Sequence, residues 1–345
     1  MVLDLRHRIE VLSQRAGPVV TLADADAVGV SRAQMRRCES LGITTRIGKS
    51  AFVLSRTLED ADAWEAFRLR SIGFAVGSGD DVYLAGASVQ AVLGLPSLGE
   101  PPPKPVALRP GNAHRGPDRT PYGRIRTGHL PPYHRWTRSG VRVVSLEYAA
   151  VDVARHTDHA EALSVLDHAL HRGADRESLS LLAKQMSRYP GIELARWAIQ
   201  HGDERVESPL ESLGRLAFLE AGRPVPLSNV WIFDDTRAYR ADLLIPDTGV
   251  VLEGDGNVKY HDRSDAASVI ADQVARERWL RRRGYGVERF DHGVARFRRE
   301  QIVIRADQAA RQRGDRPPPQ DWSLDPPARL VQWFARRTEE LRQSR

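Results

Sequence analysis

The sequence predicts a multidomain α/β protein whose two ends are organised differently. Residues 1–55 contain short helical segments around a glycine turn, whereas residues 204–313 alternate between helical and strand patterns in the clearest order of the chain. With 345 residues, of which 41% are hydrophobic and 28% charged, the chain has ample material for two or three buried cores.

The composition indicates which kind of partner the protein binds and in which cellular compartment it lies. The net charge of +6 favours an anionic partner, nucleic acid first. The sequence has neither a long apolar run nor an apolar leader, so we expect no membrane span, no membrane partner and no secretory signal. A single cysteine, Cys38, excludes an internal disulfide and a cysteine-rich zinc site, and favours a cytoplasmic location. A homodimer and a complex with a partner protein are both compatible with this composition.

The first predicted domain, residues 1–58, has the pattern of a winged helix-turn-helix. Thr21 and Ser31 are suitable N-cap residues for two short helices, the second over residues 32–41. Residues 43–54 then alternate around a glycine, as a β-hairpin does. Two short helices joined by a tight turn and followed by a hairpin favour DNA binding.

Five basic side chains would face DNA in this arrangement, with the helix in a major groove and the hairpin on phosphate. They are Arg32, Arg36 and Arg37 on the second helix, and Arg46 and Lys49 on the hairpin. The alternative is a small helical adaptor whose arginines are only solvated.

The second predicted domain, residues 59–203, is an α+β region without a catalytic spacing. A helix over 63–72 precedes a small-residue segment at 83–93, which we expect to be a buried helix. Short strands are predicted at 106–109, 123–127 and 141–145, and helices at 146–155, 159–171, 176–186 and 191–201. The histidines here are scattered, as surface or loop residues are.

The third predicted domain, residues 204–313, has the order α-β-β-β-α-β-α. Its helices are predicted at 207–221, 271–283 and 299–313, and its strands at 229–233, 239–245, 250–253 and 286–290. The arginines of the helix at 271–283 are expected mostly to form a solvated face. Residues 314–345 are predicted to be a proline-rich linker and a terminal helix over 328–341.

Three acids interrupt the apolar strands of this domain. Glu253 and Asp255 lie two apart, and Asp242 is on the preceding strand, which a short turn returns alongside. Converging carboxylates repel one another, and a hard divalent cation such as Mg²⁺ or Mn²⁺ relieves that repulsion. The pattern therefore predicts a metal site at the end of a sheet, held by Asp242, Glu253 and Asp255, that could support phosphodiester hydrolysis.

Residues 204–313 resemble the PD-(D/E)xK nuclease fold, and most closely its Vsr-like endonuclease branch. The similarity is carried by an ordered set of motifs: Ser208-Pro209-Leu210-Glu211-Ser212, the lone Asp242, Glu253-Gly254-Asp255-Gly256 and Val287-Glu288-Arg289-Phe290. This resemblance implies a restriction-endonuclease-like α/β domain with a central mixed sheet. The first two domains resemble AbiEi-type antitoxins, through the helix-turn-helix, the strand-rich middle region and Ser145-Leu146 with Asp152-Val153-Ala154-Arg155.

One position departs from the nuclease motif. The family carries lysine two residues after its acid, where this chain has Asp255. Lys259, the last lysine of a chain that has four, could supply the positive charge from a displaced position. His261 is its rival, because the Vsr-like branch often has a histidine nearby. Glu211 is either a residue that reaches the metal or a nearby ion pair, or a surface glutamate.

The resulting hypothesis is a DNA-binding protein with a Mg²⁺-dependent endonuclease domain, acting on double-stranded DNA. The resemblance implies a setting in phage defence or a toxin–antitoxin system. The alternative is a DNA-binding antitoxin or regulator whose nuclease-like domain has lost activity, as the aspartate at position 255 suggests. A nuclease acting on RNA would share the same site and differ in its substrate.

Overall fold

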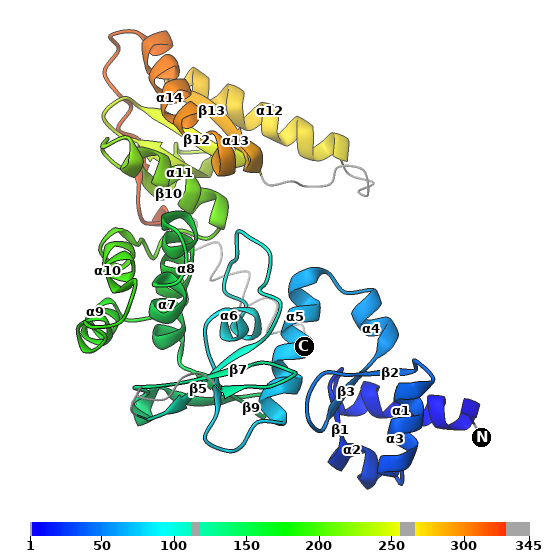
Figure 1. Cartoon of the computed structure of the whole chain (residues 1–345). Coiled ribbons are helices and arrows are strands. Elements are labelled where there is room, and N and C mark those ends of the chain that lie inside the picture. The colour runs from blue at the N-terminus through cyan, green and yellow to red at the C-terminus, as the bar shows by residue number, and fades with distance from the viewer. Residues whose placement is uncertain (1, 112–117, 256–265, 329–345) are drawn as a thin grey trace. The chain divides into compact units, whose positions relative to one another are not determined.

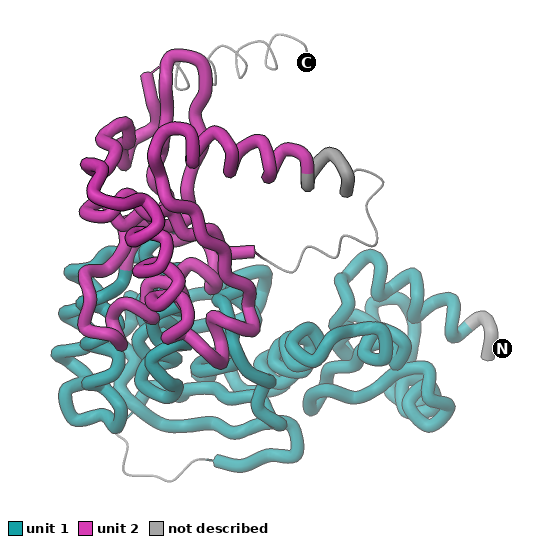
Figure 2. Tube along the Cα trace, turned by 90° about the horizontal axis from the view of Figure 1, so that it is seen from above, with its two compact units in different colours: residues 1–202 teal, residues 203–345 magenta. Residues whose placement is uncertain are grey.

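The protein is a mixed α/β multidomain protein. A computed structural model describes residues 2–111, 118–255 and 266–328. The chain divides into two compact units, residues 1–202 and 203–345 (Figure 2). The second unit begins one residue before the predicted third domain. Lys259, His261 and almost all of the predicted terminal helix lie outside the described residues.

The first unit begins with four helices and a small antiparallel sheet in the order β1-β3-β2. The elements are α1 (Val2–Ala16), β1 (Val20–Thr21), α2 (Leu22–Ala27), α3 (Arg32–Ser40), β2 (Thr44–Arg46), β3 (Ala51–Leu54) and α4 (Ser55–Glu59). Thr21 and Ser31 are the N-caps of α2 and α3, as predicted, and each forms a reciprocal capping box. Gly29, in the turn between the two helices, has a φ of 73°, a conformation that favours glycine.

The rest of the first unit is a six-stranded mixed sheet with helices, in the strand order β6-β7-β5-β4-β9-β8. Figure 1 shows α6 and α7 together beside this sheet. The strands are β4 (Tyr83–Leu84), β5 (Val106–Pro110), β6 (Asp118–Arg119), β7 (Arg124–Gly128), β8 (Arg135–Arg138) and β9 (Val141–Val144), with the 3₁₀ turn η1 (Pro132–His134). The helices are α5 (Ala63–Val76), α6 (Ala87–Leu93), α7 (Leu146–Ala154), α8 (His159–His171), α9 (Arg176–Gln185) and α10 (Ile192–His201).

One predicted helix of this region is wrong in its first half. Residues 83–93 form a strand and then a helix, because Leu84 pairs with Ala107 and Val143 on its two sides. Gly86, with a φ of 53°, makes the break between the two elements. The exposed strand β8 was not predicted, since it contributes no residue to the buried core.

The second unit has a five-stranded sheet in the order β13-β12-β11-β10-β14, in which only β12 and β13 run parallel. Its elements are α11 (Pro209–Glu220), β10 (Leu227–Phe233), β11 (Ala238–Ile245), β12 (Val250–Asp255), α12 (Ala266–Arg282), β13 (Gly286–Asp291), α13 (His292–Phe297), α14 (Glu300–Arg313) and β14 (Trp322–Ser323). The predicted α-β-β-β-α-β-α order is present, with α13 and β14 in addition.

Helices cover both faces of this sheet. Trp279 and Leu280 of α12 pack with Val251 and Val287 on one face. On the other face, Gly214 of α11 lies so close to Leu243 and Phe290 that an added Cβ would be 2.6 Å from the Leu243 side chain. Figure 1 shows α11, α13 and α14 gathered on this second face. None of the described helices is long and apolar enough to cross a membrane.

Three of the five arginines at residues 276–283 are exposed, as expected: Arg278, Arg281 and Arg282. The other two are partly buried and form ion pairs with distant acids. Arg276 of α12 bonds to Glu253, and Arg283, the residue after the helix, forms ion pairs with Asp234 and Asp321. Arg281 bonds to Glu277 and to the main-chain oxygen of Val287. These partners lie on two strands, in the turn between β10 and β11, in the segment before β14 and on α12 itself. The helical spacing of the arginines alone could not indicate them.

Candidate functional site

Antiparallel register brings two of the predicted acids together. The β11–β12 ladder pairs Leu243 with Leu252, so Asp242 and Glu253 are opposite each other one step beyond its last pair. A carboxylate oxygen of Asp242 also accepts a hydrogen bond of 2.8 Å from the main-chain N–H of Gly254. Asp242 is therefore fixed at the end of β12, where Glu253 and Asp255 lie.

The ladder between β10 and β11 is interrupted next to Asp242. Strands β10 and β11 pair Ser228 with Leu243 and Val230 with Ala241, but skip the intervening pair of Asn229 and Asp242. Asn229 has a φ of 54°, which is uncommon for a residue with a side chain. Its buried amide donates 2.6 Å hydrogen bonds to a Glu211 carboxylate oxygen and to the main-chain oxygen of Arg205.

Glu211 is buried, so the surface-glutamate interpretation is wrong. It is 7% exposed and lies in the first turn of α11. One carboxylate oxygen accepts from the Ser208 hydroxyl at 2.7 Å, and the other from the Glu207 N–H and from Asn229. Both oxygens are thus used at the start of the helix, in a capping arrangement with Ser208.

Arginines neutralise the two acids of β12. Glu253, which is 6% exposed, accepts a 2.8 Å hydrogen bond from Arg276 of α12. Asp255, whose side chain is 43% exposed, accepts one of 2.7 Å from Arg289 of β13. Both arginine side chains are partly exposed, so their guanidinium groups also border the site.

Asp242 is the electrostatic centre of the cluster. Burial, opposed by Arg276, raises the pKa of Glu253 to about 8, and the charge of Asp242 adds to this rise. Burial also raises the pKa of Asp242, to which Asp255 contributes, and that of Glu211, to which Asp242 contributes. Burial and mutual repulsion therefore disfavour the ionised form of all three carboxyl groups.

The donor set suits a small divalent cation that keeps part of its hydration shell. Within the described ranges, no three His, Cys, Asp or Glu side chains are grouped so that they could hold a metal ion. Mg²⁺, however, is commonly bound through one or two carboxylates, with water and phosphate oxygens completing its shell. Asp242 and Glu253 are two hard oxygen donors whose repulsion such an ion would relieve.

Three residues of this site were absent from the predicted set: Asn229, Arg276 and Arg289. No sequence pattern indicated that Asn229 belongs to the site, because its bond to Glu211 depends on the interruption of the β10–β11 ladder. Arg289 lies in the motif used for the resemblance, but nothing in the sequence paired it with Asp255. A local signal did exist for Glu211, since Ser208 followed three residues later by Glu before an apolar run is a capping box.

Helix α3 presents a basic surface in the first unit. Arg32, Arg36 and Arg37 are exposed, while Met35 and Cys38 on the opposite side are buried. Among the described residues, no side-chain hydrogen bond or ion pair engages these three arginines. Their positive charge is therefore available to an anionic partner.

The hairpin β2–β3 differs from the expectation of a free wing. Arg46 forms a 3.1 Å ion pair with Glu39, and its guanidinium lies 4.9 Å from the centre of the Phe52 ring. The turn packs against α5, where an added Cβ on Gly48 would clash with the main chain of Gly73. Lys49 is exposed. The packing of this turn against α5 therefore limits how far the hairpin could contact DNA phosphate in the way that the sequence predicted.

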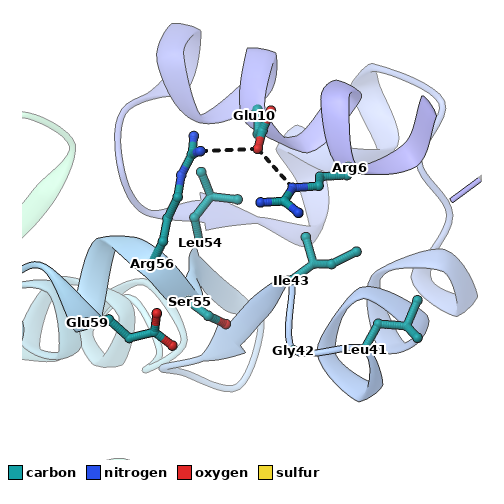
Figure 3. A pocket seen from close by; sticks show the side chains of 9 residues that line it. All are labelled: Arg6, Glu10, Leu41, Gly42, Ile43, Leu54, Ser55, Arg56 and Glu59. Atoms are coloured by element: carbon teal, nitrogen blue, oxygen red, sulfur yellow. Dashed lines mark hydrogen bonds and ion pairs between the residues drawn. The ribbon is translucent and has the colours of Figure 1, made fainter. Parts of the chain in front are cut away.

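A pocket of about 190 Å³ lies beside α3 in the same region (Figure 3). Glu10 bridges two arginines in it, at 3.2 Å from Arg6 and 3.4 Å from Arg56. Glu59 adds a second acid to the lining. Two positive and two negative side chains leave no surplus of charge, so this pocket is not a phosphate site.

Comparison with known proteins gives two partial relatives. A scan against models of protein families finds no match. Uncharacterized protein MT2308 and uncharacterized protein Rv2248, from two strains of Mycobacterium tuberculosis, are each 31% identical over 146 residues, which is 41% of this chain and 51% of each relative. The chain thus spans about half the length of the curated relatives it matches.

A solved structure is also similar, but weakly. The crystal structure of the RV2827C protein from Mycobacterium tuberculosis covers 63% of this chain and 82% of its own, at 18% identity and a TM-score of 0.35. That score is too low to define a shared fold.

Proposed function

We propose that the protein is a DNA-binding, metal-dependent endonuclease. The observation that carries this proposal is the buried acid cluster where the β11–β12 ladder ends, with Asp242 opposite Glu253. Burial raises the pKa of Glu253, and the charge of Asp242 adds to that rise. Carboxyl groups that repel one another on two inner strands, bordered by partly exposed arginines, fit a site for a divalent cation and a phosphodiester.

The residues divide into two roles. Asp242 and Glu253 would hold the ion, with Asp255 beside them. A bound Mg²⁺ would help to form the attacking hydroxide from water and would stabilise the charge that develops on the phosphate. Arg276 and Arg289 would bind phosphate oxygens once the carboxylates face the ion. Glu211 positions the site through Asn229, and Lys259 or His261 is proposed to aid proton transfer or charge stabilisation.

The first unit would hold the substrate. Its element order, α1-β1-α2-α3-β2-β3, would suit a winged helix, and α3 with its exposed arginines would enter the major groove. Contacts from Arg32, Arg36 and Arg37 to phosphate would supply salt-dependent affinity for double-stranded DNA. Arg46 and Lys49 would contribute from the hairpin.

A second candidate function is a DNA-binding regulator or antitoxin without catalysis. The ion pairs of Glu253 with Arg276 and of Asp255 with Arg289 favour it, because each acid already has a counter-charge. In such a protein the two arginines would neutralise the carboxylates, and no metal ion would bind.

Nicking of supercoiled plasmid by the purified full chain separates the two functions. The endonuclease should nick DNA with Mg²⁺ or Mn²⁺ and not with EDTA. Asp242→Asn and Glu253→Gln should each abolish nicking while DNA binding persists. Asp272→Asn is the matched control, because Asp272 is an exposed acid on α12 about one turn before Arg276. Salt-dependent DNA binding without nicking under every metal condition would favour the regulator.

A further inference from the structure

A second basic surface lies in the first unit, on the edge strand β8. Residues 119–146 contain six arginines and no acid, which is unusual in a chain where acids nearly equal bases. Two of these arginines are neutralised: Arg126 bonds to Asp152 at 2.5 Å, and Arg142 pairs with Asp80 at 3.0 Å. Among the described residues, Arg135 and Arg138 of β8 form no ion pair.

Exposed aromatic rings accompany these charges. Tyr133 is 61% and Trp136 44% exposed, although large rings are usually buried. The Trp136 indole N–H donates to the main-chain oxygen of Tyr133 at 3.2 Å, which fixes the orientation of the ring. The guanidinium of Arg135 donates two hydrogen bonds to the main-chain oxygen of Leu130. The side chains are thus held in place before any partner binds.

Trp136 and Arg138 point to the same side of β8. They pair with Val143 and Val141 of β9, and residues two apart on a strand share a face. Beside Arg138 lies a cavity of about 350 Å³, whose lining includes the apolar Ile72, Val76 and Val92. Burial and the charge of Arg138 lower the pKa of Arg172, which places a further cation near this strand.

Edge protection alone does not explain this surface. Charged residues on an edge strand prevent pairing with other strands, and Arg135 and Arg138 could serve in that way. Exposed tyrosine and tryptophan have the opposite effect, because they are apolar and favour strand pairing. Cations without acidic partners, fixed rings and an adjacent apolar cavity together fit a ligand that carries phosphates and flat bases.

We propose that β8 and the adjacent cavity bind single-stranded nucleic acid, with a base stacked on Trp136 and phosphate on Arg138, which shares its face of the strand. This surface uses none of the residues of α3 or of the acid cluster. The proposal therefore does not rest on the endonuclease function, and either can fail alone.

Fluorescence anisotropy of the full chain with labelled dT20, rU20 and a 20-base-pair duplex tests the proposal. Trp136→Ala should weaken binding of one or both single strands at least about fivefold, and Trp136→Phe should restore most of it. Arg138→Ala should lower the slope of log K against log salt by about 0.7 for single strands. The Trp136→Ala variant should leave that slope unchanged, because it removes stacking and no charge.

Two controls separate this surface from other effects. Arg70→Ala removes an exposed arginine of α5, and Leu181→Ala removes an exposed apolar residue of α9, so neither should change single-strand binding. A triple Arg32, Arg36 and Arg37 to alanine variant should lose duplex binding and keep dT20 binding. Absence of single-strand binding in the unaltered chain, or equal binding by Trp136→Ala, would overturn the proposal and favour a protein partner for β8.

Discussion

Glu253 should make the second unit less stable as the pH rises, by an amount that the structure allows one to calculate. Burial raises its pKa from 4.5 to about 8, so the folded state binds the proton more tightly than the unfolded state. The contribution of Glu253 to the free energy of unfolding is then highest below pH 4.5 and falls between pH 4.5 and 8, at about 1.4 kcal/mol per pH unit. Over that interval the loss amounts to about 5 kcal/mol.

Glu253→Gln removes this dependence, because glutamine does not titrate. Urea unfolding followed by tryptophan fluorescence should show little difference between the variant and the unaltered chain near pH 4.5. Near pH 8.5 the variant should be the more stable, by up to about 5 kcal/mol. Leu252→Val is the matched control on the same strand, since a buried apolar change of this kind costs about 1 kcal/mol at every pH.

Mg²⁺ adds a second arm to this experiment. An ion bound at Glu253 would favour the ionised carboxylate, so the fall in stability with pH should be smaller in Mg²⁺ than in EDTA. Equal pH dependence of the Glu253→Gln variant and the unaltered chain would refute the raised pKa of Glu253. Identical curves in Mg²⁺ and EDTA would speak against a metal at this carboxylate.

Three further outcomes are expected. Replacing Arg36 and Arg37 by alanine should lower the slope of log K against log salt for duplex DNA by about 0.9 per lost phosphate contact, measured by anisotropy. Asp152→Asn should destabilise the first unit by about 3–5 kcal/mol at pH 7 in a urea titration, because the buried carboxylate bonds to two arginines and to a main-chain N–H. Lys259→Ala should abolish plasmid nicking with DNA binding nearly intact; nicking that survives this change but is lost in His261→Ala would transfer the role to the histidine.

Sequence patterns alone determined most of the local structure. Thr21 and Ser31 cap their helices because a hydroxyl acceptor needs only a nearby main-chain N–H, which the adjoining residues supply. The neighbouring placement of Asp242 and Glu253 was equally predictable, since a short turn between two apolar strands brings them back antiparallel. Residues 83–93 show the limit of such patterns, because small apolar residues suit a buried strand as well as a buried helix.

Only the tertiary structure decided which charges meet. Arg276 is 23 residues from Glu253, and Arg126 is 26 residues from Asp152, so no local spacing links either pair. Similar arginines on α3 remain exposed, whereas Arg46 is paired with Glu39 and stacks on Phe52. Residue type fixes the charge a side chain can carry, but packing fixes its solvation and its neighbours, and these determine whether that charge stabilises the fold or stays available for a ligand.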